Sequence, residues 1–303
     1  MITVKNAQVI GLDELPKYST WFPYLLGIEK SSHSFAKTKE NILREYGDDK
    51  WGNLLKRLSQ ENNLTIDEAD IISSGMDRIV AFYSQGKLLS GSLYDVNQTY
   101  FDLVHSVLSA EKEKTNHYIE LGAGYGTIIF KLAKAFGFED YSYTAAEFTD
   151  TGVKCMQRIA SDQDWNIQIG HCDLASLDLS HFDISSGSVF FTSWTMACLK
   201  GFSRTSLHAL LERKPSMVYH SGSGSFLYVC EPIKEHAKLK YGNERHWGYT
   251  EDDALRYFLE NIHTFFTQID SICIRLHPSE PQGKYDAIVS AFNLPITFGG
   301  KGT

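Results

Sequence analysis

The stretch that decides the fold is Tyr118-Ile119-Glu120-Leu121-Gly122-Ala123-Gly124-Tyr125-Gly126. Its apolar first half predicts a strand, three alternate glycines follow, and a helical pattern over 127–136 comes next. Glycine is needed where the backbone adopts positive φ or where a ligand comes close to the main chain. In open α/β sheets, ligands bind at the carboxyl ends of the strands. The stretch therefore predicts a strand–loop–helix unit that holds a ligand.

Short apolar runs alternate with helical segments after this stretch begins. In chain order, we expect strand 118–121, helix 127–136, strand 141–146, helix 150–160, strand 165–169, strand 188–192, helix 204–213, strand 226–230, helix 251–265, and strands 271–276 and 285–291. The last two strands are too close in sequence for a parallel crossover, but a hairpin can join them. This order predicts an α/β fold: a Rossmann-like, doubly wound, mainly parallel sheet with a final antiparallel strand.

The region before about residue 115 has mostly helical spacing of apolar residues. It predicts helices over 34–46, 51–58 and 97–108, and Thr65 with Glu68 forms a capping box for another helix. We therefore divide the chain into a helical cap and substrate-binding region over 1–110 and a catalytic, cofactor-binding domain over 111–303. The cap also offers a surface for a homodimer.

The glycine spacing distinguishes two kinds of cofactor. A dinucleotide site carries G-x-G-x-x-G, whereas this loop reads G-x-G-x-G, with Glu120 two residues before the first glycine. A diphosphate requires amide donors and no carboxylate nearby. Glu120 therefore favours a cofactor that carries a positive charge.

An apolar strand, an acid and G-x-G-x-G resemble the first motif of the class I S-adenosylmethionine-dependent methyltransferases. The resemblance covers roughly residues 116–293. It implies the fold described above, S-adenosylmethionine as cofactor, and methyl transfer as the reaction. The residues that it places at the cofactor's amino-acid end are Glu120, Gly122, Ala123, Gly124 and Gly126.

The same resemblance implies contacts with the adenosine end. Glu147 ends the second strand, where an acid can accept hydrogen bonds from both ribose hydroxyls. Phe148 follows it and can pack on the adenine face. Asp173 comes after the third strand, with Cys172 beside it, and can meet the adenine amino group. A solvated loop acid is the alternative interpretation of Asp173.

In the resembled family, the segment after the fourth strand forms the floor of the binding site. Thr192 and Ser193 can bond the cofactor or the acceptor, and Trp194 and Met196 can form an apolar wall beside the transferred methyl group. Core packing is the alternative interpretation of each residue.

Candidates for removing a proton from the acceptor lie further along the chain. Glu231 ends the fifth strand, His246 lies in a connecting segment rich in aromatic and charged residues, and His220 precedes a Gly/Ser run. Histidine suits this role because its pKa lies near neutrality. The acceptor contacts expected in the connecting segment are Arg245, Trp247 and Tyr249. The sequence has no metal-ligand spacing, so we expect a metal-free reaction.

The composition of the chain argues against some classes of binding partner. The net charge of −8 and the absence of a dense basic run argue against nucleic acid. No apolar stretch approaches the roughly 20 residues of a membrane span, and the first residues lack signal-peptide features. The five cysteines form no C-x-x-C pair, which fits free thiols in the cytoplasm.

We expect a small-molecule acceptor: a hydroxyl of a sugar or natural product, or a carbon of an α-keto acid derived from an amino acid. The alternatives are an NAD(P)-dependent oxidoreductase and a non-catalytic cofactor-binding protein.

Overall fold

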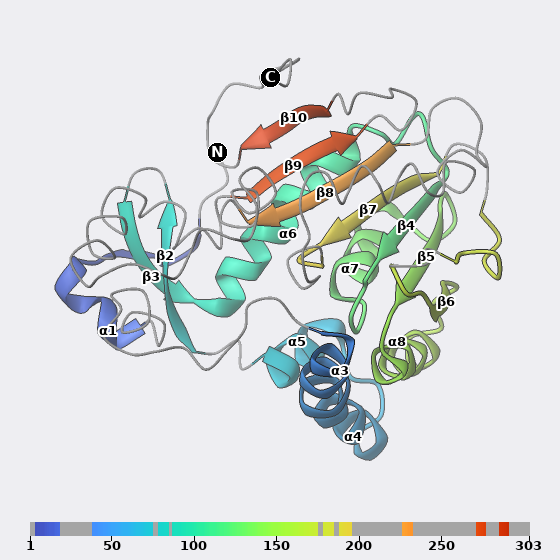
Figure 1. Ribbon diagram of the computed structural model, residues 1–303, viewed down its shortest axis with the longest axis horizontal. Helices are drawn as coiled ribbons and strands as arrows, with labels where there is room; N and C mark the ends of the chain where they lie inside the picture. Colours follow the sequence, from blue (N-terminus) through green and yellow to red (C-terminus); the bar gives the residue numbers. More distant parts are fainter. Residues whose placement is uncertain are drawn as a thin grey trace.

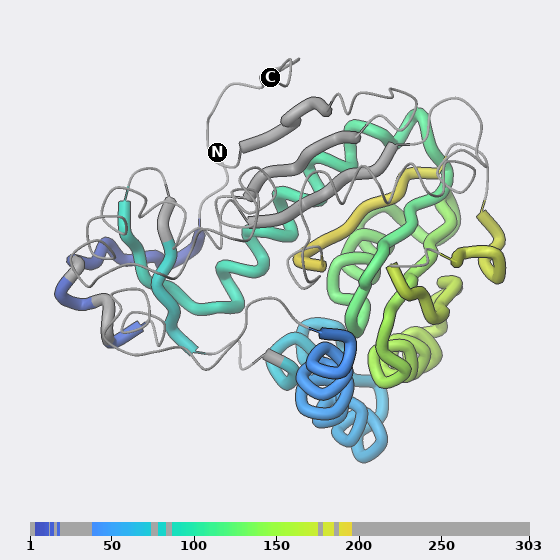
Figure 2. Tube along the Cα trace, in the orientation of Figure 1, coloured from blue at the N-terminus to red at the C-terminus, as the bar shows by residue number. Residues whose placement is uncertain are grey.

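The computed structural model describes residues 4–18, 38–74, 78–84, 87–174, 178–184 and 188–195, together with the backbone of three strands at 226–232, 271–276 and 285–290. Figure 2 draws most of these segments in colour along the Cα trace. The helices expected over 204–213 and 251–265 lie outside the described residues.

A seven-stranded sheet forms the centre of the molecule (Figure 1). Its strands are β4 (His117–Leu121), β5 (Ser142–Glu147), β6 (Gln168–His171), β7 (Val189–Ser193), β8 (Phe226–Pro232), β9 (Ser271–Leu276) and β10 (Tyr285–Ser290). Their spatial order is β10-β9-β8-β7-β4-β5-β6. Within this sheet, β4 comes first in the chain, and β5 and β6 follow it toward one edge. The chain then crosses back, so that β7 and β8 lie on the other side of β4. The doubly wound sheet is confirmed, and β4 and β7 flank its switch point.

Strand direction changes only at one edge of this sheet. Strands β6, β5, β4, β7 and β8 are parallel neighbours. Strand β9 is antiparallel to β8, and β10 is antiparallel to β9. The antiparallel strand is therefore the next-to-last one, and β10 returns to the common direction. The short connection accounts for this arrangement, because it lets β9 and β10 pair only as a hairpin.

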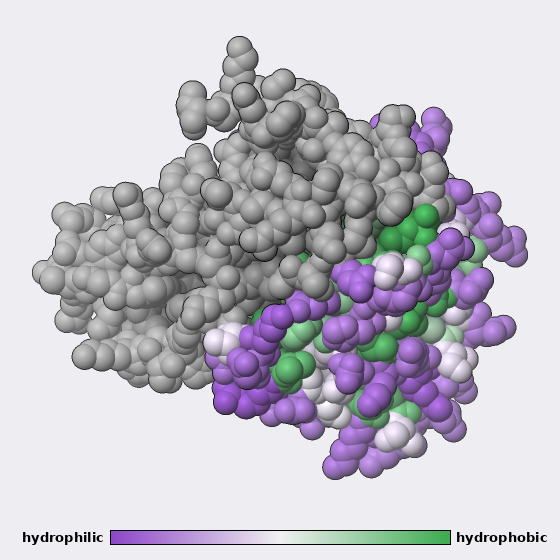
Figure 3. Space-filling model, turned by 45° about the vertical axis from the view of Figure 1, so that its right-hand side comes forward, coloured by the Kyte–Doolittle hydropathy of each residue, from purple (hydrophilic) through white to green (hydrophobic). Residues whose placement is uncertain are grey.

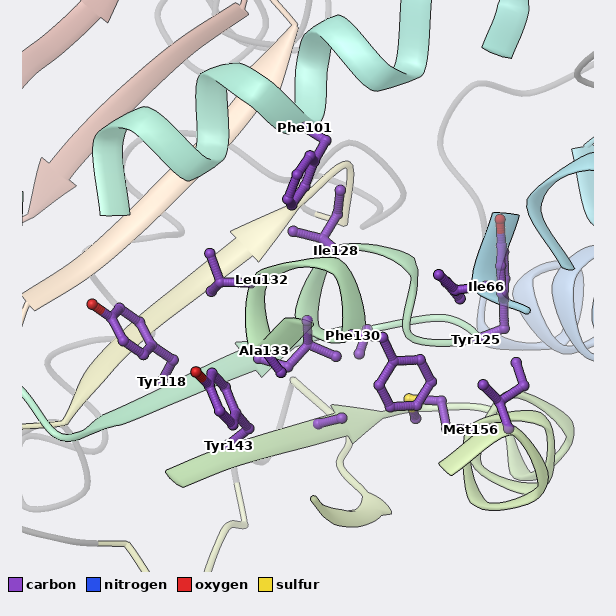
Figure 4. Close-up of a cluster of buried hydrophobic side chains, with 14 of the residues drawn as sticks. Ile66, Phe101, Tyr118, Tyr125, Ile128, Phe130, Leu132, Ala133, Tyr143 and Met156 are labelled. Atoms are coloured by element: carbon purple, nitrogen blue, oxygen red, sulfur yellow. The ribbon is translucent and has the colours of Figure 1, made fainter. Parts of the chain in front are cut away.

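Two helices follow the first two strands and bury their apolar residues. Helix α7 (Thr127–Phe136) ends at Gly137, which caps it with φ +101°, and α8 (Asp150–Asp162) begins after its N-cap Thr149. Figure 4 shows Leu132 and Ala133 of α7 between the sheet and neighbouring helices, with Tyr118 and Tyr143 extending from the adjacent strands. These side chains belong to one buried cluster.

The N-terminal region is largely helical, as expected. Its helices are α1 (Leu15–Tyr18), α3 (Lys39–Ile42), α4 (Gly52–Gln60), α5 (Ile66–Ser74) and α6 (Leu93–Ser109), with a 3-10 turn η1 (Leu12–Glu14) and a π-helix η2 (Leu43–Trp51). The capping box is confirmed, because the Thr65 hydroxyl accepts from the Glu68 N–H at 3.2 Å and the Glu68 carboxylate accepts from the Thr65 N–H at 2.8 Å.

A small antiparallel sheet in this region was not expected. It pairs β1 (Gln8–Val9), β3 (Lys87–Ser92) and β2 (Ile79–Ser84). Val80 and Phe82 of β2 pack with Leu93 and Val96 of α6 in a hydrophobic cluster of their own. The helical interpretation missed this hairpin because its two strands are short and because consecutive residues such as Val80, Ala81 and Phe82 are buried, so the alternation typical of a half-buried strand is absent.

The N-terminal helices share the main hydrophobic core. Residues of α4, α5 and α6 lie in the same buried cluster as those of α7 and α8, and Figure 1 shows α3, α4 and α5 grouped beside α8. Figure 4 places Phe101 of α6 against Ile128 of α7. The division at residue 110 stays a prediction about function, since the packing continues across it.

The surface of the described helical part is mixed. In the face shown in Figure 3, hydrophilic residues predominate and apolar ones occur in small patches between them. Within the part of the chain that the structure describes, no helix combines the length and the apolar character that a membrane span requires.

Candidate functional site

The glycine-rich loop closes tightly onto the neighbouring strand. Gly122, Gly124 and Gly126 all have positive φ, at +75°, +60° and +92°. The N–H groups of Gly122 and Ala123 both donate to the carbonyl of Ala146, at 2.7 and 3.1 Å. Residues with a Cβ are strained in this conformation, so the loop depends on its glycines.

Side chains from three elements pack where these glycines lack a Cβ. A Cβ at Gly122 would come within 2.2 Å of Thr195, and one at Gly126 would come within 2.6 Å of Phe130. At Gly124 the neighbour is Trp51, the last residue of η2, with Cζ2 at 3.2 Å. Part of the glycine requirement is therefore close packing within the protein, and the N-terminal helical segment reaches the middle of the loop.

Glu120 is buried beneath the loop. Its side chain is 2% exposed, and Oε2 accepts a hydrogen bond from the N–H of Ile129 in the first turn of α7, at 2.9 Å. Burial raises the pKa of Glu120 well above its ordinary value, the Ile129 hydrogen bond lowers it, and the neighbouring charge of Glu147 raises it further. A cation would favour the ionised form of this group.

Glu147 joins the loop to the start of α8. Oε2 accepts from the N–H of Gly124 at 2.9 Å, and Oε1 accepts from both the N–H and the hydroxyl of Thr149 at 2.9 Å. Burial raises the pKa of Glu147, although the Thr149 and Gly124 hydrogen bonds oppose this. The side chain predicted to bind ribose thus also fixes the conformation of the loop.

The residues predicted at the adenine lie next to Glu147 in space. Asp173 forms an ion pair with Lys39 at the start of α3, and the Lys39 ammonium lies 5.9 Å from the centroid of the Phe148 ring. Cys172 is buried, and its N–H donates to the Glu147 carbonyl at 2.8 Å. Burial raises the pKa of the Cys172 thiol to about 12, so the thiol stays protonated near neutral pH.

The end of β7 reaches the other side of the loop. Thr192 is fully buried, and within the described part of the chain its hydroxyl has no hydrogen-bond partner. The Ser193 hydroxyl lies 2.9 Å from the Tyr100 hydroxyl of α6, and the Thr195 hydroxyl donates to the Gly122 carbonyl at 2.9 Å. Trp194 adopts φ +58°, a conformation that non-glycine residues rarely hold without a functional or structural reason.

A buried ion pair supports the loop from α5. Asp70 is 1% exposed and accepts hydrogen bonds from Lys131 at 2.6 Å, from the hydroxyl of Tyr125 at 2.7 Å, and from Thr127. Burial lowers the pKa of Lys131, but the Asp70 and Asp67 carboxylates together outweigh this effect and the pKa is raised. The network fixes the last loop residues to the N-terminal helices.

Several predicted residues cannot be placed. Met196, His220, Arg245, His246, Trp247 and Tyr249 lie outside the described residues. Glu231 lies in β8, opposite Ile272 of β9, but only its backbone is described. Among the residues that the structure describes, no group of three or more His, Cys, Asp or Glu side chains could hold a metal ion.

Three site residues from the N-terminal region were missed: Lys39, Asp70 and, as a direct neighbour of Gly124, Trp51. Phe82, another aromatic residue of the N-terminal region, packs in the separate cluster beside α6 instead. Trp51 carries a signal in the sequence, because a tryptophan at the start of an amphipathic helix is large enough to reach a neighbouring element.

When this chain is compared with known proteins, the similar ones are found among solved structures. No protein-family model matches the sequence, and no curated protein matches it. The PH0226 protein from Pyrococcus horikoshii OT3 is 14% identical over 52% of this chain and 63% of its own, with a TM-score of 0.35. This chain therefore spans less than two thirds of that protein.

Two methyltransferases are similar to the same degree. Magnesium protoporphyrin IX methyltransferase from Synechocystis PCC 6803, solved with bound S-adenosylmethionine, is 14% identical over 76% of this chain and 88% of its own, with a TM-score of 0.37. A putative sarcosine dimethylglycine methyltransferase from Galdieria sulphuraria is 14% identical over 55% and 60%, with a TM-score of 0.39. The strand order and the loop of this chain itself define its fold class.

Proposed function

We propose that this chain is an S-adenosylmethionine-dependent methyltransferase that acts on a small-molecule acceptor. The observation that carries the proposal is the pair of buried carboxyl groups, Glu120 and Glu147, at the ends of adjacent strands around a glycine loop. Burial raises the pKa of both groups, so the site favours a ligand that brings positive charge. S-adenosylmethionine carries a sulfonium and an ammonium group.

The same geometry argues against a dinucleotide. In a phosphate-binding loop, the backbone N–H groups face the diphosphate. Here the Gly124 N–H donates to Glu147, and the N–H groups of Gly122 and Ala123 donate to Ala146. The loop therefore has few donors to offer a diphosphate, and two carboxylates would repel it.

The described residues suit the parts of the cofactor. Glu120 and the loop from Gly122 to Gly126 would hold the amino-acid part, and Glu147 would accept from the ribose hydroxyls. Phe148 and Asp173 would meet the adenine, which would share Asp173 with Lys39. The unpartnered Thr192 hydroxyl suits a polar atom of a ligand at the end of β7.

Bound S-adenosylmethionine supplies a methyl group already activated by its positively charged sulfur, so the protein contributes mainly positioning and exclusion of water. Ser193, Trp194 and Met196 would border the acceptor. Arg245, Trp247 and Tyr249 would contact it. Of His246, Glu231 and His220, we propose that one accepts the acceptor's proton.

The acceptor class rests on charge and on the N-terminal helices. A net charge of −8 disfavours nucleic acid, and Trp51 and Lys39 bring α3 and η2 close to the loop, which narrows access for a protein acceptor. We propose a hydroxyl of a sugar or natural product, or a carbon of an α-keto acid. We further propose that the chain acts in the cytoplasm and that its N-terminal helices can form a homodimer.

A binding screen followed by a turnover assay tests the proposal. Calorimetry should show binding of S-adenosylmethionine and S-adenosylhomocysteine, with no binding of NAD⁺ or NADP⁺. Incubation with pools of hydroxylated natural products, sugars and α-keto acids should give a product heavier by one methylene group. Binding of NAD⁺ alone would favour an oxidoreductase, and cofactor binding without a product from any acceptor pool would favour a non-catalytic protein.

A further inference from the structure

Trp51 contains a buried hydrogen-bond donor. The indole Nε1 is shielded from solvent and has no hydrogen-bond partner among the residues that the structure describes. Indole N–H is a donor only, so nothing but an acceptor can satisfy it. A buried donor without a partner is costly, and native proteins rarely retain one without a reason. The donor therefore points to an acceptor that is brought by a ligand.

The orientation of the ring places this donor at the glycine loop. The atoms of Trp51 nearest to a Cβ at Gly124 are Cζ2 at 3.2 Å, Cη2 at 3.7 Å and Cε2 at 3.8 Å. Nε1 is bonded directly to Cε2, so the N–H lies on the same long edge of the indole as the ring atoms that approach the loop. The Gly124 N–H in turn donates to Glu147, so the indole donor lies in the neighbourhood of the predicted ribose acid.

The surrounding protein holds this ring in place. The Trp51 ring packs against Tyr125 at 4.8 Å and Tyr46 at 5.7 Å between centroids. Its backbone carbonyl accepts a hydrogen bond from the Cys155 thiol of α8 at 3.4 Å. A side chain fixed in this way loses little conformational freedom when a ligand binds, which favours affinity.

The backbone around Trp51 is also unusual. Trp51 ends the nine-residue π-helix η2, which continues directly from α3 into α4. A Cβ at Gly47, in the middle of η2, would lie 3.9 Å from Thr149 and Thr151 at the start of α8. π-Helical turns are rare and are frequent at functional sites. Here the distortion lies beside the loop and sets the position of Trp51.

We propose that Trp51 is a cofactor-binding residue that donates its indole N–H to an oxygen of the ligand held at Gly122–Gly126. The inference rests on the proposed function. The acceptor belongs to one of two parts of the cofactor, a ribose hydroxyl or the amino-acid carboxylate. In either case the N-terminal helical segment contributes directly to cofactor binding.

The test compares Trp51→Phe with the control Trp165→Phe. Trp165 packs against Phe130 and Phe138, whereas the side chain nearest to Gly124 is Trp51. Trp51→Phe should weaken binding of S-adenosylhomocysteine about tenfold, in line with a lost hydrogen bond to a fixed donor. The melting temperature of the ligand-free protein should stay unchanged or rise, because a buried unpaired donor disappears. Trp165→Phe should leave affinity unchanged.

Two further measurements separate the possible outcomes. 5′-Methylthioadenosine has the ribose but no carboxylate: a loss of affinity for both ligands assigns the acceptor to the ribose, and a loss for S-adenosylhomocysteine alone assigns it to the carboxylate. The Trp51 indole N–H signal in a ¹H–¹⁵N spectrum, identified by its absence in Trp51→Phe, should move downfield on binding. Should that variant not fold, the benzothiophene analogue of tryptophan at position 51 keeps the shape and removes only the N–H.

The inference fails if wild type binds S-adenosylhomocysteine and Trp51→Phe or the analogue binds equally well. It also fails if the indole signal does not shift. A wild-type protein that does not bind the cofactor at all contradicts the proposed function instead.

Discussion

The buried polar groups at the starts of the parallel strands differ in their surroundings from those at the carboxyl ends. At the start of β4, both ring nitrogens of His117 have hydroxyl partners, Thr144 at 2.8 Å and Ser188 at 3.3 Å. At the carboxyl ends, Glu120 and Glu147 are buried with raised pKa values, and the Thr192 hydroxyl has no partner among the described residues. His117 is thus satisfied by two neutral hydroxyl groups, whereas the carboxyl groups at the strand ends keep raised pKa values despite their protein hydrogen bonds. We propose that the positive charge of a ligand compensates the groups at the strand ends.

The largest expected effect is a loss of stability when the Asp70 network, which supports the glycine loop at the carboxyl ends of the strands, is broken. Asp70→Ala leaves Lys131 buried without its main counter-charge and also removes the partner of Tyr125. Breaking a buried ion pair from one side costs about 3–5 kcal/mol. We expect a loss of this size in the free energy of unfolding, measured in urea.

Asp67→Ala is the matched control for this change. Asp67 pairs with the same Lys131 at 3.2 Å but is 48% exposed, so its loss should cost less than about 1 kcal/mol. Equal losses from the two variants would contradict the view that the Asp70 network supports the glycine loop from a buried position.

The second effect is a pH dependence at the starts of the strands. Burial lowers the pKa of His117 to about 4, from about 6.5 in the unfolded chain. Between these values the unfolded state binds more protons, so stability is complete above pH 6.5 and falls as the pH drops toward 4. From pH 6.5 to pH 5, this histidine should remove roughly 2 kcal/mol.

The variant His117→Asn should be less stable than wild type at pH 7 but lose less on acidification. Urea unfolding at pH 5 and pH 7 measures both quantities. An unchanged difference between the two pH values in the variant would mean that another group causes the acid sensitivity.

The third effect falls on binding at the strand ends. Glu147→Gln replaces a carboxylate that accepts three hydrogen bonds, and the amide can accept at only one of its two heavy atoms. We expect affinity for S-adenosylhomocysteine to fall about tenfold, the size of one charge-assisted hydrogen bond, and Glu147→Ala to bind more weakly still.

Circular dichroism checks that these variants fold, because Glu147 also holds the Gly124 and Thr149 N–H groups in place. A folded Glu147→Ala that binds as tightly as wild type would remove Glu147 from the site.

The smallest effect concerns the partly exposed ion pair Lys39–Asp173, where we predict that the adenine binds. Lys39 is 57% exposed and Asp173 is 25% exposed, so Lys39→Met should change the free energy of unfolding by less than about 1 kcal/mol. Asp173→Asn should likewise leave stability nearly unchanged and yet weaken cofactor binding. Chemical denaturation and calorimetry on the same samples measure the two effects, and a large stability loss in either variant would mean that this end is structural.

Local signals account for what the sequence predicted well. Helix α7 begins and ends as expected, because the glycine loop and Gly137 limit it on both sides, and the capping box at Thr65 is read from two residues. The alternation of strands and helices predicted the doubly wound sheet. The cofactor-binding roles of the loop and of Glu147 stay predictions.

Long-range contacts account for what the sequence did not predict. The pairs Lys39–Asp173 and Asp70–Lys131 join residues 134 and 61 positions apart, and no local pattern reveals them. The π-helix η2 packs against α8, a contact that no local sequence pattern reveals. The same holds for Trp51, whose contact with Gly124 follows from how η2 lies on the loop.

The central claim is that the buried acids Glu120 and Glu147 bind S-adenosylmethionine, and the protons released on binding test it most directly. Calorimetric titration of S-adenosylmethionine near pH 6, in buffers with different ionisation enthalpies, gives the number of protons released. If the cofactor's positive charge lies beside Glu120 and its ribose hydroxyls donate to Glu147, binding lowers the raised pKa values of both groups, protons leave the protein, and affinity decreases as the pH falls. Glu147→Gln should release fewer protons. Tight binding with no proton release at any pH between 5 and 7 would contradict the account.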